Sequence, residues 1–207
     1  MTDDMNDEAQ NARHAEKMKK KKAARDKILA TKTIEKGLVI VHTGKGKGKS
    51  TAAFGMAFRS LGHGHKIAVI QFVKGAWNSG EKQVLERFPE LVTIKAMGEG
   101  FTWETQDRQK DIDNARAAWE AAKETILDPD IRFVLLDELN IVLRYDYLPI
   151  EEIIEFLQNE KPEDTHVVIT GRNAKDELIE IADLVTEMTL IKHPFRSGVK
   201  AQEGIEF

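Results

Sequence analysis

The sequence of 207 residues contains no cysteine, which excludes disulfides, thiolate metal sites and cysteine nucleophiles. It has no apolar run near the roughly 20 residues that a membrane-spanning helix needs, and its N-terminus lacks the apolar stretch of a secretion signal. We therefore expect a cytoplasmic protein without membrane contact, whose reaction uses no protein thiol. The hydrophobic content of 41% is sufficient for one globular domain with a buried core.

Residues 1–36 lack glycine and proline, and they carry ten Lys or Arg against seven Asp or Glu, whereas the remainder carries 21 against 28. This composition permits a helix but offers little apolar surface for a core. We expect a basic extension over residues 1–36, disordered at its start and then helical, followed by a domain over residues 37–207. The lysine run at 17–22 could suggest a nucleic-acid arm, but no aromatic residue is interleaved for base stacking. A solvated helix face is favoured, and no nucleic-acid partner is expected.

Beyond this extension, short apolar runs alternate with segments of helical period. The runs are rich in β-branched residues, as is typical of strands buried on both faces, and they lie at 38–41, 67–72, 92–94, 133–136 and 167–169, with a last candidate at 184–191. The helical segments lie at 50–61, 81–88, 105–127, 150–157 and 174–182. This alternation predicts βαβ units and a three-layer α/β fold with a mainly parallel sheet of about six strands.

A segment rich in glycine and lysine joins the first predicted strand to the first predicted helix, and it consists of Gly44, Lys45, Gly46, Lys47, Gly48, Lys49, Ser50 and Thr51. Strand, loop and helix in this order are the context of a P-loop, whose backbone amides hold phosphates. Lys49 would reach the terminal phosphates and Ser50 would bind Mg²⁺. Thr43 stands where the standard motif has glycine. A flexible turn is the alternative, but it leaves the flanking strand and helix unexplained, so we predict a P-loop NTPase-like (RecA-like) fold.

Two acidic residues, Asp137 and Glu138, end the apolar run at 133–136. Ligands of parallel α/β sheets bind at the carboxyl ends of strands, so this pair resembles a Walker B element that supports Mg²⁺. A helix N-cap or a surface acidic pair is the alternative. Arg172, which follows the run at 167–169, is a candidate for contacting a phosphate, although an exposed loop arginine is almost as good an interpretation.

Three further segments, at 100–106, 137–149 and 198–207, are unusual for a generic P-loop protein. Together with the phosphate loop they resemble the P-loop class of ATP:corrinoid adenosyltransferases, from the first strand to the C-terminus. Members of that family also have threonine at the position of Thr43, whereas Lys45 and Ser50 replace the more common asparagine and threonine. The resemblance implies transfer of the 5′-deoxyadenosyl group of ATP to the cobalt of a Co(I) corrinoid with release of triphosphate, in biosynthesis or salvage of adenosylcobalamin.

The resemblance also implies roles for individual residues. Lys49 would act in catalysis on the triphosphate, and Phe101 and Trp103 would sit against the corrin and help to remove the lower axial ligand of cobalt; ordinary core packing is their alternative. Asp137 and Glu138 would act only as metal ligands, because no water has to be activated. The implied substrates are MgATP and a corrinoid such as cobyrinic acid a,c-diamide, cobinamide or cobalamin. A reduced flavoprotein would donate electrons, and the enzyme would be a homodimer in which the N-terminal segment covers an active site.

Two other functions remain open on the residues alone. One is a P-loop phosphotransferase or ATPase, which would need a base positioned for attack by water or a hydroxyl group. The other is a nucleotide-gated interaction module whose basic N-terminal segment binds nucleic acid.

Overall fold

The computed structural model describes residues 2–73, 79–97 and 107–206, and the chain forms two compact units, Met1–Glu35 and Lys36–Phe207. The first unit contains the helix α1 (Thr2–Leu29). Every side chain of α1 whose burial is described, at residues 7, 8 and 10–29, is exposed, and none of them forms a buried face. The second unit holds the sheet and the candidate site.

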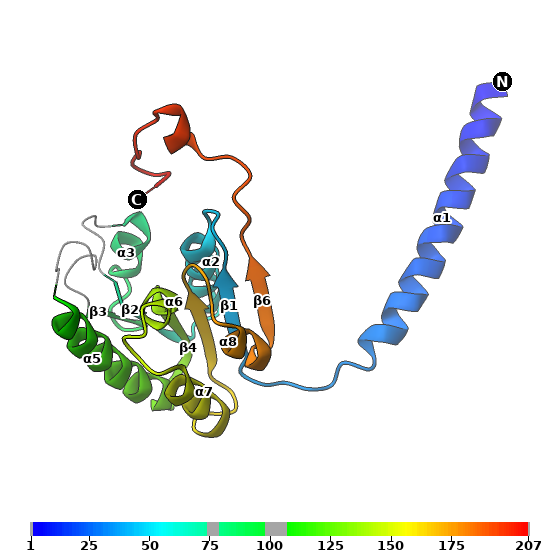
Figure 1. The fold of residues 1–207 in the computed structure, drawn as a ribbon. Coiled ribbons are helices and arrows are strands. Elements are labelled where there is room, and N and C mark those ends of the chain that lie inside the picture. Colours follow the sequence, from blue (N-terminus) through cyan, green and yellow to red (C-terminus); the bar gives the residue numbers. More distant parts are fainter. Residues whose placement is uncertain (1, 74–78, 98–106, 207) are drawn as a thin grey trace. The chain divides into compact units, whose positions relative to one another are not determined.

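The sheet has six strands in the order β3-β2-β4-β5-β1-β6, and all neighbouring strands are parallel (Figure 1). Their bounds are β1 (Val39–Thr43), β2 (Lys66–Gln71), β3 (Val92–Ala96), β4 (Ile131–Asp137), β5 (His166–Thr170) and β6 (Leu184–Glu187). The predicted α/β fold with about six parallel strands is confirmed. The last strand is shorter than the predicted 184–191, because its partner β1 ends at Thr43, opposite Glu187, and the next backbone bond of Met188 is with Gly46 of the phosphate loop.

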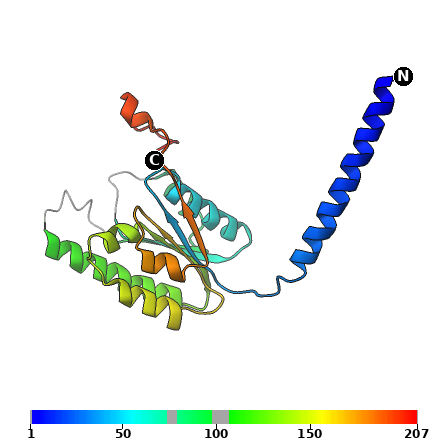
Figure 2. The same ribbon diagram turned by 45° about the vertical axis from the view of Figure 1, so that its right-hand side comes forward.

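Helices cover both faces of the sheet (Figures 1 and 2). One face is covered by α2 (Lys49–Gly62) and α3 (Gly80–Leu85), and the other by α5 (Arg108–Leu127), α6 (Leu139–Arg144), α7 (Ile150–Asn159) and α8 (Asp176–Ile181). A short 3₁₀ helix, η1 (Pro194–Ser197), follows β6. The sequence predicts no helix at α6. Among the described residues, no helix combines the length and apolarity needed to cross a membrane.

Alternation along the strands divides the core between these two layers. On β1, Ile40 joins the cluster under α2, whereas Val39 and Val41 join the cluster under α5 and α7. The largest fully buried side chain, Trp119 of α5, meets Phe156 of α7 edge to face, with ring centroids 5.4 Å apart. Such a pair contributes about 0.5–1.5 kcal/mol beyond its area burial. Both layers therefore hold the central strands β1, β4 and β5 in a fixed position.

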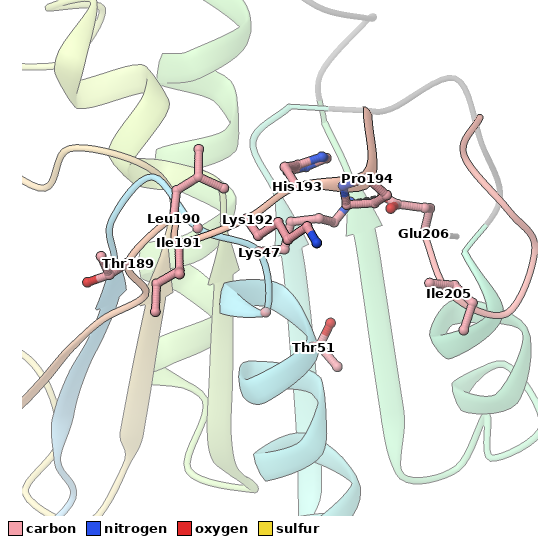
Figure 3. Close-up of a pocket in the computed structure, with 12 residues that line it drawn as sticks. Lys47, Thr51, Thr189, Leu190, Ile191, Lys192, His193, Pro194, Ile205 and Glu206 are labelled. Carbon is pink, nitrogen blue, oxygen red and sulfur yellow. Dashed lines mark ion pairs between the residues drawn. The ribbon is translucent and has the colours of Figure 1, made fainter. Parts of the chain in front are cut away.

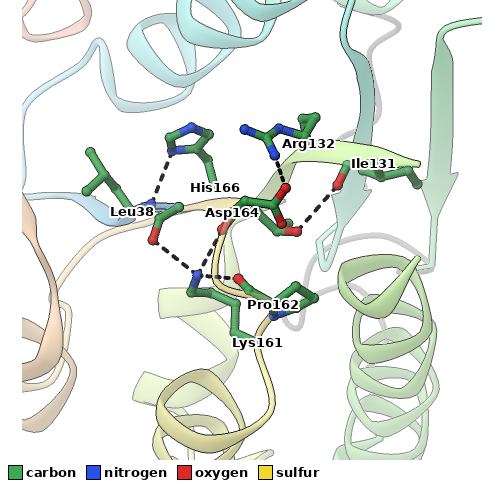
Figure 4. A network of polar contacts seen from close by, with 9 residues as sticks. Leu38, Ile131, Arg132, Lys161, Pro162, Asp164 and His166 are labelled. Atoms are coloured by element: carbon green, nitrogen blue, oxygen red, sulfur yellow. Dashed lines mark hydrogen bonds and ion pairs between the residues drawn. The ribbon is translucent and has the colours of Figure 1, made fainter. Parts of the chain in front are cut away.

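A polar network fixes the start of β1 against the loop that leads into β5 (Figure 4). The ammonium of Lys161 donates to three backbone carbonyl oxygens over 2.8–3.1 Å, those of Gly37, Pro162 and Thr165. Burial lowers the pKa of Lys161. The backbone amide of Leu38 donates to Nδ1 of His166 at 3.1 Å. These bonds hold the register of β1 and β5, and this register positions the opposite ends of the two strands.

Gly37 is the closest approach in this network, since a Cβ added there would lie 2.2 Å from the carbonyl oxygen of Thr165. We expect Gly37→Ala to lower the free energy of unfolding by about 1–3 kcal/mol, because the two backbones must separate. Gly55→Ala is the matched control, because Gly55 lies in the middle of α2 and a Cβ added there would face open space. It should raise stability by about 0.5–1 kcal/mol through helix propensity. Urea unfolding measures both changes, and equal stabilities would contradict the close approach at Gly37.

Candidate active site

The candidate site lies at the edge of the sheet where β1, β2, β4 and β5 end. In the strand register, His42 is opposite Thr170 and Gln71 is opposite Asp137, so the four carboxyl ends are level with one another. The phosphate loop (residues 44–51) follows β1, the acidic pair ends β4, and Arg172 follows β5. Parallel α/β sheets bind their ligands at this edge. The fold thus brings together the candidate residues predicted from the described parts of the sequence.

The phosphate loop leads directly into the N-terminus of α2. Gly48 precedes the helix with φ 105°, no side chain caps the helix, and its first turn contains no acidic residue. The first amides of α2 are thus available for an anion, and the helix dipole favours negative charge there. Lys49 is only 7% exposed, and its Nζ donates to the carbonyl oxygen of Gly46 at 2.6 Å. Burial lowers the pKa of Lys49, although the nearby charge of Glu138 opposes this shift.

Backbone contacts with the segment after β6 hold the loop in shape. The amide of Gly46 donates to the carbonyl oxygen of Met188 at 2.6 Å, and the amide of Met188 donates to the carbonyl oxygen of Thr43 at 2.8 Å. The hydroxyl of Thr43 accepts a hydrogen bond from the amide of Ala174 at 2.9 Å. Thr43, which stands at the first glycine position of the standard motif, therefore joins the loop to the segment that follows β5.

The first acidic residue, Asp137, connects β4 to the phosphate loop. It is 6% exposed, and Oδ1 accepts a hydrogen bond of 2.8 Å from the hydroxyl of Thr170. Burial raises the pKa of Asp137, and side-chain hydrogen bonds with Thr170, Ser50 and Gln71 oppose the shift. The structure thus brings Ser50 and Asp137, two of the three predicted metal ligands, into contact.

The second acidic residue, Glu138, has a strained backbone and an unpaired oxygen. Its φ of 63° and ψ of 21° lie in the left-handed region, which costs a residue other than glycine on the order of 1–3 kcal/mol. Its amide donates to the hydroxyl of Thr170 at 2.9 Å, and its buried Oε2 has no hydrogen-bond partner among the described residues. Burial and the charge of Asp137 raise the pKa of Glu138 to about 7, while Lys49 and Arg172 oppose the shift. A buried carboxylate in this setting is a suitable ligand for a cation.

The remaining candidates divide into three groups. Arg172 is exposed, but its charge lowers the pKa of both Lys47 and Lys49, so its guanidinium belongs to the same positive cluster. Lys45 and Thr51 are exposed residues of the loop. Phe101 and Trp103 lie outside the described residues.

A cavity of about 640 Å³ lies beside the phosphate loop (Figure 3). Its walls come from the loop and from the C-terminal residues, and its lining consists of Gly46, Lys47, Gly48, Thr51, Thr189, Leu190, Ile191, Lys192, His193, Pro194, Ile205 and Glu206. One ion pair joins the two walls, between Lys47 and Glu206. The phosphate loop forms one wall of the cavity, and the lining combines the aliphatic side chains of Leu190, Ile191 and Ile205 with polar and charged residues.

Comparison with known proteins assigns the chain to a family. Residues 35–207 match the family described as "ATP:corrinoid adenosyltransferase BtuR/CobO/CobP". The chain belongs to the ATP:corrinoid adenosyltransferase family. A corrinoid adenosyltransferase of Sinorhizobium sp is 63% identical over 201 residues, which are 97% of this chain and 94% of the relative. Proteins of the same name from Pseudomonas aeruginosa and Escherichia coli are 53% and 45% identical, each over 94% of this chain and over 96% and 98% of the relatives.

The family match covers the whole sheet domain, including the phosphate loop, the acidic pair and the C-terminal residues. The resemblance to ATP:corrinoid adenosyltransferases inferred from the sequence is therefore confirmed, and so is the enzyme type.

Sequence reasoning missed the polar residues that organise this adenosyltransferase site. Thr170 bridges the two acidic residues, Gln71 bonds to Asp137, and the backbone of Met188 holds the phosphate loop. A signal was available for the first two, because each is a polar residue at the carboxyl end of an apolar strand next to β4. The contact of Met188 carries no side-chain signal, since it uses only backbone atoms.

Thr170→Val tests the bridge between the acidic residues. It removes the hydroxyl that donates to Asp137 and accepts from the amide of Glu138, so we expect kcat/KM to fall about 10- to 100-fold. The matched control is Thr165→Val, which removes a buried hydroxyl at the other end of β5, where its contact with the Ile131 carbonyl is 3.5 Å. Adenosyltransferase kinetics and thermal melting are measured for both variants. Equal losses of kcat/KM in the two variants would contradict a specific role of Thr170 in the site.

Proposed function

We propose that the chain transfers the 5′-deoxyadenosyl group of ATP to the cobalt of a reduced corrinoid, with the triphosphate held by the loop at residues 44–51. The observation that carries the proposal is that the adenosyltransferase match spans the domain whose loop has an uncapped helix N-terminus beside Lys49. The names of relatives at 45–63% identity over nearly the full length support the same activity.

The chemistry assigns the protein a limited role. The Co(I) centre supplies an electron pair that forms a cobalt–carbon bond to C5′ of ATP. The bond from C5′ to oxygen breaks, and the electron pair of that broken bond leaves with triphosphate. No protein nucleophile is required, which agrees with a chain that has no cysteine. The protein must align cobalt with C5′ and stabilise the growing charge on the leaving triphosphate. Lys49 and the first amides of α2 are the groups that we propose for this stabilisation.

Mg²⁺ is the metal that we propose to accompany ATP, with Ser50, Asp137 and Glu138 as candidate ligands. The described residues contain no cluster of three or more His, Cys, Asp or Glu that could form a metal cage. This fits Mg²⁺, which is usually held by one or two protein oxygens together with substrate phosphates and waters. The buried, unpaired Oε2 of Glu138 and the contact of Ser50 with Asp137 support this choice. When bound, the cation would neutralise charge on the triphosphate.

Lys45, Lys47, Thr51 and Arg172 complete the proposed nucleotide site. The charge of Arg172 lowers the pKa of Lys47, and the charges of Arg172 and Lys47 lower the pKa of Lys49, which indicates a concentration of positive charge that a polyanion would relieve. The exposure of Thr51 on the cavity wall suits a contact with the part of ATP beyond the phosphates.

Other features stay proposals from the resemblance. The enzyme would be a cytoplasmic homodimer, and the basic extension over residues 1–36 would cover an active site. A reduced flavoprotein would donate the electron that reduces the corrinoid to Co(I). Phe101 and Trp103 would contact the corrin.

Lys49→Ala tests the phosphate site. Loss of the ammonium should lower kcat about 10²- to 10³-fold, because the contact strengthens as triphosphate leaves. Lys66→Ala is the control, since Lys66 is an exposed residue at the other end of β2 and pairs with Asp130. The rate of adenosylcobalamin formation is followed for folded variants. A near-normal kcat in Lys49→Ala would show that this loop is not the catalytic phosphate site.

Alanine at Phe101 or Trp103 tests the corrin contact. If these side chains exclude the axial ligand, reaction from a Co(II) corrinoid should suffer more than reaction from pre-reduced Co(I), while ATP affinity stays close to wild type. Truncation of core aromatics would instead cost about 3–5 kcal/mol of stability and slow both routes. The measurement is the ratio of the two rates on variants with a preserved melting temperature, and an unchanged ratio would assign both residues to packing.

A further inference from the structure

The C-terminal strap, defined as residues 188–206, contacts the phosphate loop at both of its ends. At its start, the carbonyl oxygen of Met188 accepts the amide hydrogen bond of Gly46. At its other end, the carboxylate of Glu206 pairs with the ammonium of Lys47 (Figure 3). Between these two contacts, residues 189–194 and Ile205 form one wall of the 640 Å³ cavity.

The end of the strap places a negative charge where the loop is most positive. The side chain of Glu206 is only 12% exposed, so its carboxylate lies within the site. Its partner Lys47 is the central lysine of the loop, and burial together with the charge of Arg172 lowers the pKa of Lys47. A carboxylate in this place resembles one oxygen pair of a phosphate in charge and geometry.

Apart from Glu206, large side chains of the strap lie mostly in solvent, and the backbone hydrogen bonds of Ile205 and Glu206 are local ones to Gln202. Ile205, the neighbour of Glu206, is 78% exposed, and Phe195 in the middle of the strap is exposed to the same extent. The side chain of Lys47 is itself about half exposed, and such ion pairs contribute little to stability. A triphosphate, which contacts several amides and cationic side chains at once, would outcompete this single pair.

We infer that the carboxylate of Glu206 occupies the anion position at Lys47 when no nucleotide is bound, so that an incoming triphosphate exchanges with it and releases the end of the strap. This inference rests on the proposed function, since it takes the loop as the triphosphate site. The start of the strap stays attached through Met188, so the exchange changes the outer part of the cavity wall and leaves the loop in shape.

The test is calorimetric titration of inorganic triphosphate with Mg²⁺ into wild type, Glu206→Gln and Glu206→Ala. Removal of the competing charge should tighten binding about two- to fivefold in both variants. Glu203→Gln is the matched control, because Glu203 is an exposed carboxylate of the same strap, and it should leave the affinity unchanged. Adenosine, which has no phosphate, should bind equally to all four proteins. Thermal melting checks that each variant is folded.

Weaker or unchanged triphosphate binding in the Glu206 variants would overturn the inference, and so would an equal gain in Glu203→Gln. If wild type still binds triphosphate, neither outcome contradicts the proposed function. Absence of triphosphate binding to wild type would overturn the phosphate site, and this inference with it.

Discussion

The hydroxyl of Thr170 donates to the buried carboxylate of Asp137 and accepts from the amide of Glu138, and the rest of the site depends on this pair of bonds. β5 lies between β1, which leads into the phosphate loop, and β4, which carries the acidic pair. Among the described strands, only β5 pairs with both, so a residue at its carboxyl end lies next to both halves of the site. The register is held at the opposite edge by Lys161 and by the close approach of Gly37. Packing at one end of the sheet thus fixes polar geometry at the other.

Charge at this edge is concentrated and incompletely neutralised. Burial opposes ionisation of Asp137 and Glu138 on one side, and it lowers the pKa of Lys47 and Lys49 on the other. A cation next to the carboxylates and a polyanion next to the lysines would relieve both costs together. The left-handed backbone of Glu138 adds strain of the kind found at functional sites. This electrostatic arrangement supports MgATP as the substrate of the domain.

Local patterns in the sequence predict much of this arrangement. The apolar runs predict β1, β2, β4 and β5 because these strands are buried on both faces, whereas the edge strands β3 and β6 are only partly buried. The run of residues 44–51 predicts the phosphate loop because glycines and lysines follow a strand there. Long-range contacts could not be predicted in the same way. β6 ends early because its partner β1 ends at Thr43 and the carbonyl oxygen of Met188 bonds instead to Gly46 of the phosphate loop, and Glu206 reaches Lys47 across about 160 residues of sequence. No local propensity encodes either contact, and the corrin roles of Phe101 and Trp103 stay predictions.

In the proposed reaction, ATP is cleaved at C5′ and its phosphates leave as one unit. The most direct measurement is incubation of the protein with ATP, Mg²⁺ and chemically reduced cobalamin, with separate quantification of the light-sensitive cobalt–carbon product and of the inorganic products. We expect adenosylcobalamin and triphosphate in equal amounts, with neither forming when the corrinoid is omitted. Formation of ADP and phosphate without a cobalt–carbon product, while a control adenosyltransferase is active in the same mixture, would contradict the proposed reaction.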